Sequence, residues 1–246
     1  MTTPRLYDEL SDLWPLVSPP DDCAAEAKHA RDILLRCLDE TGVHKRYSIL
    51  ELGSGAGHTF CHLVDEFDAE AVDLSGPMLD RSRALNPAVT HHAADLRTVR
   101  LGKRFDAVLA YDSLDYMLTE ADLRAAFVTA AEHLRPGGLF VAAINYTCET
   151  FAEHESAHDF HSDGDVDLTN ISYVHAHPSG VGIELVMLLL VRQDGELRVE
   201  EDRHHCGLFP LETWQHLLDE AGFDVEEPDQ TDAGTWFVAV KRDATP

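Results

Sequence analysis

Basic residues are scarce in this sequence. Its 246 residues include 19 Lys and Arg against 45 Asp and Glu, which gives a formal net charge of −26. This field repels nucleic-acid phosphates, and no Lys- or Arg-rich run offsets it. The composition therefore argues against a nucleic-acid partner, and solubility or a saline host is the simpler explanation of the acidity.

Paired cysteines and long apolar runs are also lacking. The five cysteines are scattered, odd in number and form no C-x-x-C, which favours free thiols in a reducing compartment. The first residues, M-T-T-P-R-L-Y-D-E, contain no apolar signal core. The longest apolar run, Leu185 to Val191, is too short to span a bilayer. We expect a soluble cytoplasmic protein with no membrane partner.

A glycine-rich turn is the most informative feature that is present. Residues 47–59 read Y-S-I-L-E-L-G-S-G-A-G-H-T, an apolar run that stops at Gly53, Gly55 and Gly57 before a segment, about 58–67, that we expect to be helical. A strand, a glycine turn and a helix present backbone N–H groups to a ligand at the strand's carboxyl end. Glycine also lets a ligand lie against bare backbone. The turn therefore predicts a cofactor site.

Two classes of cofactor compete for this turn. A dinucleotide site requires G-x-G-x-x-G, and His58 stands where the last glycine would fall. An acid, Glu51, precedes the turn, close to where a pyrophosphate would lie. The turn therefore favours a cationic or zwitterionic ligand. A nicotinamide-dependent oxidoreductase is the runner-up, and the chain also lacks its Tyr-x-x-x-Lys.

The rest of the chain alternates apolar strands with helices, which implies α/β architecture with a parallel, doubly wound sheet. A helix over 22–37 precedes the alternation. Strands are predicted at 48–52, 69–73, 88–92, 105–111 and 139–144, and helices at 58–67, 77–84 and 120–134.

After residue 145 the pattern changes. Residues 147–166 show little apolar periodicity, and three antiparallel strands follow at 171–177, 182–193 and 196–203. Asp194-Gly195 between the last two is a strong hairpin signal. We expect 183–191 to be buried on both faces. A helix at 211–221 and strands at 223–226 and 236–241 complete the chain.

We expect a single domain, residues 1–246, with four segments. These are an N-terminal arm and helix (1–46), a cofactor-binding core (47–146), an antiparallel insert or lid (147–207) and the C-terminal end of the core sheet (208–246).

The stretch E-L-G-S-G-A-G, residues 51–57, strongly resembles motif I of class I S-adenosylmethionine (SAM)-dependent methyltransferases. H-L-R-P-G-G-L-F, residues 133–140, resembles the turn before the fifth strand in that family, and residues 205–223 match more weakly. The resemblance implies SAM as cofactor. It also implies a Rossmann-like, seven-stranded sheet with an antiparallel last strand, here with a small antiparallel β insert after strand five.

SAM makes three demands on its site. Asp73, 20 positions after Gly53, has the spacing of an acid that takes ribose hydroxyls. Asp95 and Leu96 can supply a carboxylate and a backbone N–H to the adenine. The glycine turn and Glu51 suit the methionine end. The predicted cofactor-binding residues are Glu51, Gly53, Ser54, Gly55, Gly57, Asp73, Leu74, Met78, Asp95, Leu96 and Tyr111.

Methyl transfer is an in-line displacement in which the enzyme aligns the nucleophile and excludes water. A base helps when the nucleophile is a hydroxyl or an ammonium. We rank Tyr7, Tyr116 and His204 highest as catalytic residues. The wider set of candidates adds Trp14, Tyr111, Asp112, Asp115, Asn145, Tyr146 and His205.

The chain as a whole looks most like small-molecule methyltransferases that N-methylate amino sugars. It shares their N-terminal Tyr7-Asp8, the helix with Ala25-Glu26-Ala27, and H-x-x-L-F at 205–209. It departs from them at Cys23 and in the acidic stretch 112–115, which suits a cationic amine. We expect transfer to N or O of a small molecule. A non-catalytic SAM-binding protein is the alternative, and the oligomeric state, including a homodimer, stays open.

Two histidine groups raise the question of a metal. His154, His158 and His161 have spacings that would place them on one face of a helix, and His204-His205-Cys206 form a second group. A zinc site needs converging ligands, usually with a second pair elsewhere. We interpret both as ordinary histidines and predict no metal.

Overall fold

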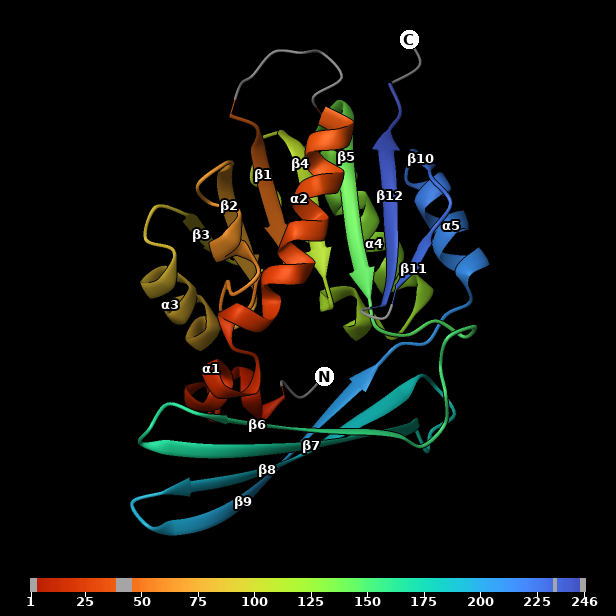
Figure 1. Cartoon of the computed structure of the whole chain (residues 1–246). Helices are drawn as coiled ribbons and strands as arrows, with labels where there is room; N and C mark the ends of the chain where they lie inside the picture. The colour runs from red at the N-terminus through yellow and green to blue at the C-terminus, as the bar shows by residue number, and fades with distance from the viewer. Residues whose placement is uncertain (1–3, 39–45, 232–233, 244–246) are drawn as a thin grey trace.

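A mixed β-sheet forms the core of the protein (Figure 1). The computed structural model describes residues 4–38, 46–231 and 234–243. The strand order is β10-β12-β5-β4-β1-β2-β3, with β11 paired to β12. Strands β1 to β5 are parallel, and β12 runs antiparallel to β5, as expected. The strands are β1 (Ser48–Leu52), β2 (Asp68–Asp73), β3 (Thr90–Ala93), β4 (Phe105–Tyr111), β5 (Leu134–Ile144), β10 (Phe223–Val225), β11 (Asp229–Thr231) and β12 (Gly234–Lys241).

Helices cover both faces of this sheet, which explains its long apolar runs. Ile49 of β1 points to the face covered by α2 (Ala24–Leu38), where Ile33 and Leu34 are buried. Its neighbour Leu50 points to the opposite face, covered by α4 (Glu120–Glu132) and α5 (Leu211–Glu220). Helix α3 (Gly76–Leu85) lies beside β2 and β3, as Figure 1 shows.

The helix expected at 58–67 is wrong. This segment contains only a 3-10 turn, η5 (Phe60–His62), flanked by irregular turns. The β-branched Thr59 and Val64 have low helix propensity, and the segment is short. Its position depends instead on three buried side chains, those of Phe60, Leu63 and Phe67.

A separate four-stranded antiparallel sheet follows β5, with the order β6-β7-β8-β9. Its strands are β6 (Glu155–Ser162), β7 (Val166–Ala176), β8 (Ile183–Gln193) and β9 (Glu196–Cys206). We predicted only three of them. Strand β6 was missed because its residues are mostly polar and exposed, so it lacks the alternation that marks a half-buried strand.

The expectation that 183–191 is buried on both faces is also wrong. Met187, Leu189 and Val191 are buried, whereas the intervening Leu188 and Leu190 are partly exposed. The strand thus has the period of two that a sheet with one covered face imposes. Its apolar sequence concealed this alternation.

The N-terminal arm covers the inner face of this second sheet. It consists of η1 (Arg5–Tyr7), η2 (Ser11–Leu13), α1 (Trp14–Val17) and η3 (Pro20–Cys23). Figure 1 shows α1 between the two sheets. Four arm leucines form one buried cluster with apolar side chains of β7 and β8: Leu6, Leu10, Leu13 and Leu16 with Leu168, Met187, Leu189 and Val191.

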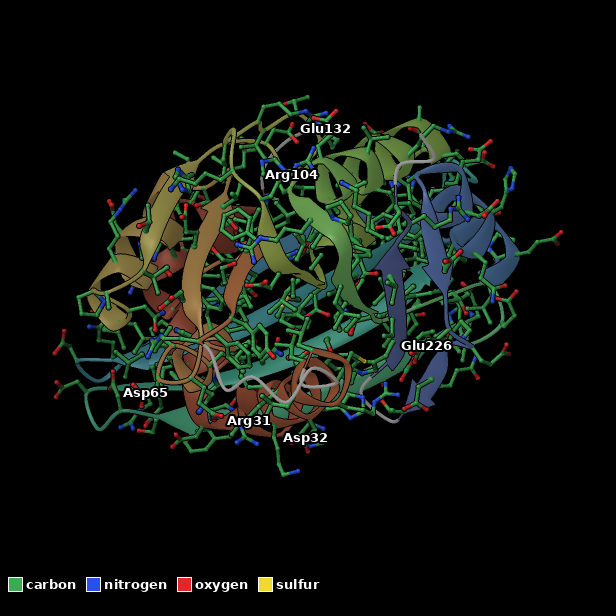
Figure 2. The ribbon with its side chains drawn as sticks, turned by 90° about the horizontal axis from the view of Figure 1, so that it is seen from above. Arg31, Asp32, Asp65, Arg104, Glu132 and Glu226 are labelled. Atoms are coloured by element: carbon green, nitrogen blue, oxygen red, sulfur yellow. The ribbon has the colours of Figure 1, made fainter. Side chains whose placement is uncertain are left out.

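Charged side chains lie at the periphery. Figure 2 views the core from the end opposite the second sheet, with Arg31 and Asp32 on α2 and Glu132 at the end of α4. Arg31 pairs with Glu66, and Arg100 pairs with Glu132. Exposed pairs of this kind contribute little to stability, so apolar burial holds the fold. Among the described residues, no helix has the length and apolarity needed to cross a membrane.

The leucine cluster predicts how firmly the arm and the second sheet depend on each other. Leu189→Ala removes a fully buried side chain between them, so we expect it to lower the free energy of unfolding by about 2–5 kcal/mol. Leu197→Ala, on the outer face and 63% exposed, is the control, with an expected change within about 0.5 kcal/mol. Urea unfolding followed by circular dichroism measures both, and equal effects would contradict this packing.

Candidate active site

A cavity of about 630 Å³ opens at the carboxyl ends of β1, β2 and β4. This is the edge of a parallel sheet where α/β proteins bind ligands. The arm closes its other side through Tyr7 and Trp14. The cavity contains all the residues predicted to bind the cofactor except Gly57, which is not among its lining: Glu51, Gly53, Ser54, Gly55, Asp73, Leu74, Met78, Asp95, Leu96 and Tyr111.

The glycine turn owes its composition to packing as well as to ligand access. Gly53 and Gly57 both have positive φ, and a Cβ on Gly53 would lie 2.2 Å from the Cβ of Ser113. A Cβ on Gly57 would lie 2.4 Å from the Oγ of Ser82. Gly55 also has positive φ, but its nearest neighbour for a Cβ is Met78 at 3.6 Å. Gly53 and Gly55 line the cavity, and of these two only Gly55 has no close packing contact at its Cβ position, so ligand access is the simpler reason for a glycine there.

Asp73 connects the first two strand ends. Its carboxylate accepts the N–H of Gly55 at 2.7 Å and that of Ser75 at 2.7 Å. Burial raises the pKa of Asp73, and these N–H groups partly oppose that rise. A carboxylate has about four lone-pair sites, so it can still accept ribose hydroxyls. Asp73 thus both shapes the turn and presents an acceptor to the cavity.

The adenine candidates lie on the neighbouring wall. Asp95 is bound by Arg97, which also pairs with Asp122, each at 2.6 Å. The Arg97 guanidinium lowers the pKa of Asp95, so this carboxylate is ionised and fixed. Met78 is buried, whereas Leu74 is exposed at the rim. These side chains could accept an exocyclic amine and cover a ring face.

A group of acids occupies the opposite end. Glu51 is 3% exposed, and its Oε2 has no hydrogen-bond partner. Glu26 on α2 and Asp112 after β4 line the same cavity. Burial raises the pKa of all three. The sequence did not indicate that Glu26 lines this cavity, although its A-E-A helix was part of the resemblance, because nothing local places α2 beside β1.

These observations test whether SAM fits the chain. Three buried polar atoms in the cavity lack partners, namely Glu51 Oε2, Ser54 Oγ and Tyr111 Oη. Such atoms are costly unless a ligand or water satisfies them. Acids at one end suit the cationic part of SAM, and Asp73 suits its ribose. The residues present therefore fit this cofactor, which supplies an electrophilic methyl group when bound.

The three predicted catalytic side chains lie together. The hydroxyl of Tyr7 is 2.7 Å from that of Tyr116, which is 2.7 Å from Nδ1 of His204. The other ring nitrogen of His204 lies 3.2 Å from Oδ2 of Asp202. Burial raises the pKa of Tyr7 and of Tyr116, so both remain neutral phenols.

Asp202 is a residue that the sequence did not indicate. Its carboxylate accepts the backbone N–H of Arg5 at 3.0 Å and of Leu6 at 2.8 Å. Burial alone would raise the pKa of Asp202, but His204 and these N–H groups outweigh it, and the net shift is downward. It carries no local motif, and only the pairing of β9 with the arm shows its place.

The wider candidates divide in two. Trp14 lines the cavity, and Asp112 does so as well. Asp115 is buried and lies outside the cavity lining, and its carboxylate accepts the Nδ2–H of Asn145 at 2.7 Å. Tyr146 packs on Phe151, and the ring of His205 stacks on His177 with centroids 3.8 Å apart, both outside the cavity lining.

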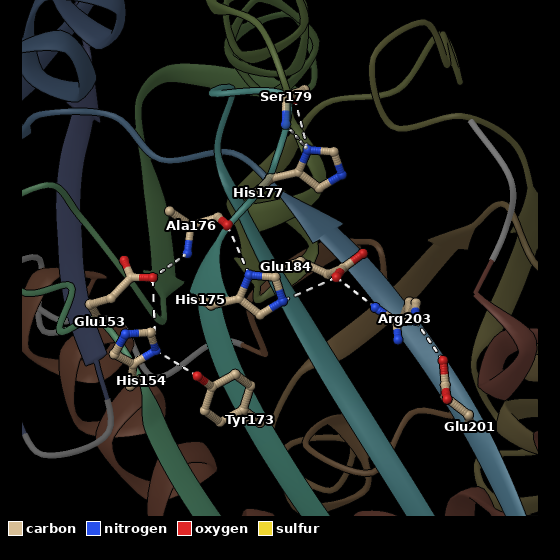
Figure 3. Close-up of polar contacts among 10 residues, drawn as sticks. All are labelled: Glu153, His154, Tyr173, His175, Ala176, His177, Ser179, Glu184, Glu201 and Arg203. Carbon is tan, nitrogen blue, oxygen red and sulfur yellow. Dashed lines mark hydrogen bonds and ion pairs between the residues drawn. The ribbon is translucent and has the colours of Figure 1, made fainter.

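The helical face expected for His154, His158 and His161 is wrong. His154 precedes strand β6, and along that strand His158 and His161 point to opposite faces because side chains alternate. Figure 3 shows His154 bonded to Tyr173 and His175 bonded to Glu184. Within the described ranges, no three His, Cys, Asp or Glu side chains are grouped as a metal site requires.

A Rossmann-like sheet with an antiparallel β12, a glycine turn and a carboxylate at the end of β2 together define a class I SAM-dependent methyltransferase. Comparison with known proteins agrees. The family described as "Methyltransferase domain" matches residues 49–138. A dTDP-3-amino-3,4,6-trideoxy-alpha-D-glucopyranose N,N-dimethyltransferase of Streptomyces venezuelae is 31% identical over 208 residues, 83% of this chain and 85% of the relative.

Other relatives agree in type. A dTDP-3-amino-3,6-dideoxy-alpha-D-glucopyranose N,N-dimethyltransferase of Streptomyces fradiae is 30% identical and covers 74% of this chain and 72% of its own. The crystal structure of Streptomyces venezuelae DesVI superposes with a TM-score of 0.83 at 28% identity, covering 95% and 97% of the two chains. The structure of the sugar N-methyltransferase KedS8 from Streptoalloteichus sp ATCC 53650 superposes with a TM-score of 0.82 at 27% identity, covering 99% of this chain and 95% of that chain. The chain belongs to the SAM-dependent methyltransferases, in the amino-sugar N-methyltransferase branch.

The position of Asp73 generates a binding prediction. Asp73→Asn removes a charged acceptor from the ribose end, so we expect SAM affinity to fall by about 10- to 100-fold, the value of a charge-assisted hydrogen bond. Titration calorimetry measures the affinity, and a thermal melt checks that the turn is intact. Asp80→Asn on the outer side of α3 should bind SAM like the wild type. Undiminished binding by Asp73→Asn would remove this residue from the site.

Proposed function

We propose that this enzyme transfers a methyl group from SAM to the amino nitrogen of a small amino sugar. The observation that carries the proposal is the chain of hydrogen bonds from Tyr7 to His204, which begins at the cavity wall. Two relatives that are named as N,N-dimethyltransferases of dTDP-linked amino sugars support the same substrate class. We infer transfer to nitrogen rather than oxygen, and propose that the predicted cofactor residues hold SAM.

The direction of this hydrogen-bond chain follows from Asp202. An ionised carboxylate beside Nε2 of His204 favours the tautomer with its proton on that nitrogen. Nδ1 is then the acceptor of the Tyr116 hydroxyl, whose oxygen accepts the hydroxyl proton of Tyr7. Both protons point toward His204, and the lone pairs of the Tyr7 oxygen are left for an N–H of the substrate.

This arrangement serves a nucleophilic amine. When bound, SAM would supply its methyl group to the nitrogen lone pair, and the electrons of the broken C–S bond would stay on sulfur. The resulting ammonium then loses a proton to Tyr7, Tyr7 passes its own to Tyr116, and Tyr116 passes its own to Nδ1 of His204. Asp202 stabilises the imidazolium that forms. Since burial keeps both phenols neutral, they act as a conduit, and His204 is the base.

The arm contributes the exclusion of water. Trp14 lies against Tyr7, with ring centroids 5.4 Å apart, and His58 Nδ1 donates to the carbonyl of Ser18 at 2.5 Å. Burial lowers the pKa of His58, so it is neutral near pH 7 and its N–H fixes the arm without adding charge. Both contacts hold the arm over the cavity, where alignment and desolvation favour displacement.

Tyr7→Phe tests the proposed conduit. The variant keeps the aromatic packing and loses the hydroxyl, so we expect kcat to fall about 100-fold or more while SAM affinity stays within about twofold. Tyr173→Phe, on the outer face of β7, is the matched control with unchanged kcat. Transfer of labelled methyl to a panel of free and nucleotide-linked amino sugars, with phenols for comparison, gives the readout. SAM binding without transfer to any amine would favour a non-catalytic SAM-binding protein.

A double variant separates a conduit from independent effects. Because Tyr7 and His204 act in one path, Tyr7→Phe combined with His204→Gln should be little slower than the worse single variant. If the kcat of the double variant falls by the product of the two single-variant factors, a shared path is contradicted. Wild-type kcat in Tyr7→Phe would remove Tyr7 from the chemistry altogether.

A further inference from the structure

The acidic end of the cavity contains more negative charge than any neighbouring cation balances. Glu26 comes from α2, Glu51 from β1 and Asp112 from the end of β4, and all three line one space. Of the described cavity-lining residues, Arg97 is the one Lys or Arg, and it is bound by Asp95 and Asp122 at the other end.

The geometry of the three carboxylates is unusual. Glu51 is buried with an unpartnered oxygen. Asp112 has a left-handed backbone, φ 52°, which is uncommon outside glycine and places its side chain in the cavity. Asp112 is exposed to solvent at the cavity and Glu26 is half-buried, so Glu51 is the one of the three that is fully buried. A side-chain hydrogen bond from Thr59 lowers the pKa of Glu26, against the upward effects of burial and of Asp112.

We propose that Glu26, Glu51 and Asp112 form a proton-exchanging site that binds the positive end of SAM, and that the charge on sulfur decides how many protons they keep. Like charges that share one cavity disfavour one another's ionisation, and a bound cation removes that penalty. SAM has a cationic sulfur and S-adenosylhomocysteine (SAH) has a neutral one. Binding of SAM therefore releases a proton from the site. Binding of SAH, the product, releases fewer protons. This inference uses the cofactor and is independent of the amino sugar.

The local electrostatics support this direction. Burial raises the pKa of Glu26 to about 7 and that of Asp112 to about 6, and it raises the pKa of Glu51 well above its usual range. The surrounding groups do not supply a positive charge. Those that face the site are Asp73, Asp115, Cys23, Tyr7, Tyr111 and Cys206, together with the uncharged Thr59 and Asn145.

The sign of the pH dependence follows. A cation favours the ionised acids, so it lowers their pKa values and SAM affinity rises with pH between about 5.5 and 8. One released proton corresponds to about a tenfold gain in affinity per pH unit below the pKa of the site. SAH affinity should change less across this range. After transfer the sulfur loses its charge, so the carboxylates repel each other again, and exchange of SAH for fresh SAM is favoured.

Titration calorimetry of the full chain in two buffers of different ionisation enthalpy tests the proposal. At pH 6.5 the α-amino group of the ligand is already protonated, so a released proton comes from the protein. We expect about one proton released per SAM and less than half of that per SAH. Equal release for both ligands, or none for SAM, would overturn the proposal. Absence of SAM binding would instead contradict the cofactor assignment.

Variants identify the source of the proton. Glu26→Gln should lose at least half of the release and flatten the pH profile of SAM affinity, while binding at pH 6 stays within about threefold of the wild type. It should also reduce the preference for SAM over SAH at pH 8 several-fold. Asp112→Asn tests both effects independently: it should also reduce the proton release and the preference for SAM over SAH. Glu196→Gln, at the exposed β8–β9 hairpin, is the matched control with full release. Unchanged release in both Glu26→Gln and Asp112→Asn would refute this assignment, as would release that requires an acceptor amine.

Discussion

The acceptor side of the active site depends on one buried carboxylate. Asp202 of β9 accepts the N–H groups of Arg5 and Leu6, almost 200 residues away in the chain. A buried charge is costly unless hydrogen bonds satisfy it, so the backbone of the arm must return to this point. That return places Tyr7, the next residue, against Tyr116. The same carboxylate lies 3.2 Å from Nε2 of His204, so one side chain connects the arm with the histidine that we propose as the base.

The energy and the position of the arm come from different interactions. Its leucines supply apolar burial against β7 and β8, which is strong but not directional. Asp202, His58 and the ring contacts of Tyr7 supply direction. Without the second sheet there is no surface for these leucines and no Asp202. The insert thus supports the cavity through the arm and through the contact of His204 with Tyr116, although no described residue of the insert lines the cavity.

Some elements of the fold were predictable because both of their faces are buried. Strands β1 and β4 begin and end at the predicted residues, since these mostly apolar stretches stop at Gly53 and Asp112. Three errors have separate causes. Residues 58–67 depend on anchoring by Phe60 rather than on helix propensity, and β6 is too polar to show a period. In β8, apolar residues occupy a face that is only partly covered.

The sequence by itself determined the glycine turn and the place of Asp73 at the end of β2, because both follow from local spacing. Asp73 is an example, since its place follows from a strand, a turn and a count of residues. The tertiary structure alone decided that Asp202 joins the arm to His204, and that Glu26, Glu51 and Asp112 share a cavity. These groups lie on different elements, and their electrostatics arise from burial and from neighbours distant in sequence. Charge and desolvation act through space, so a pattern along the chain does not contain them.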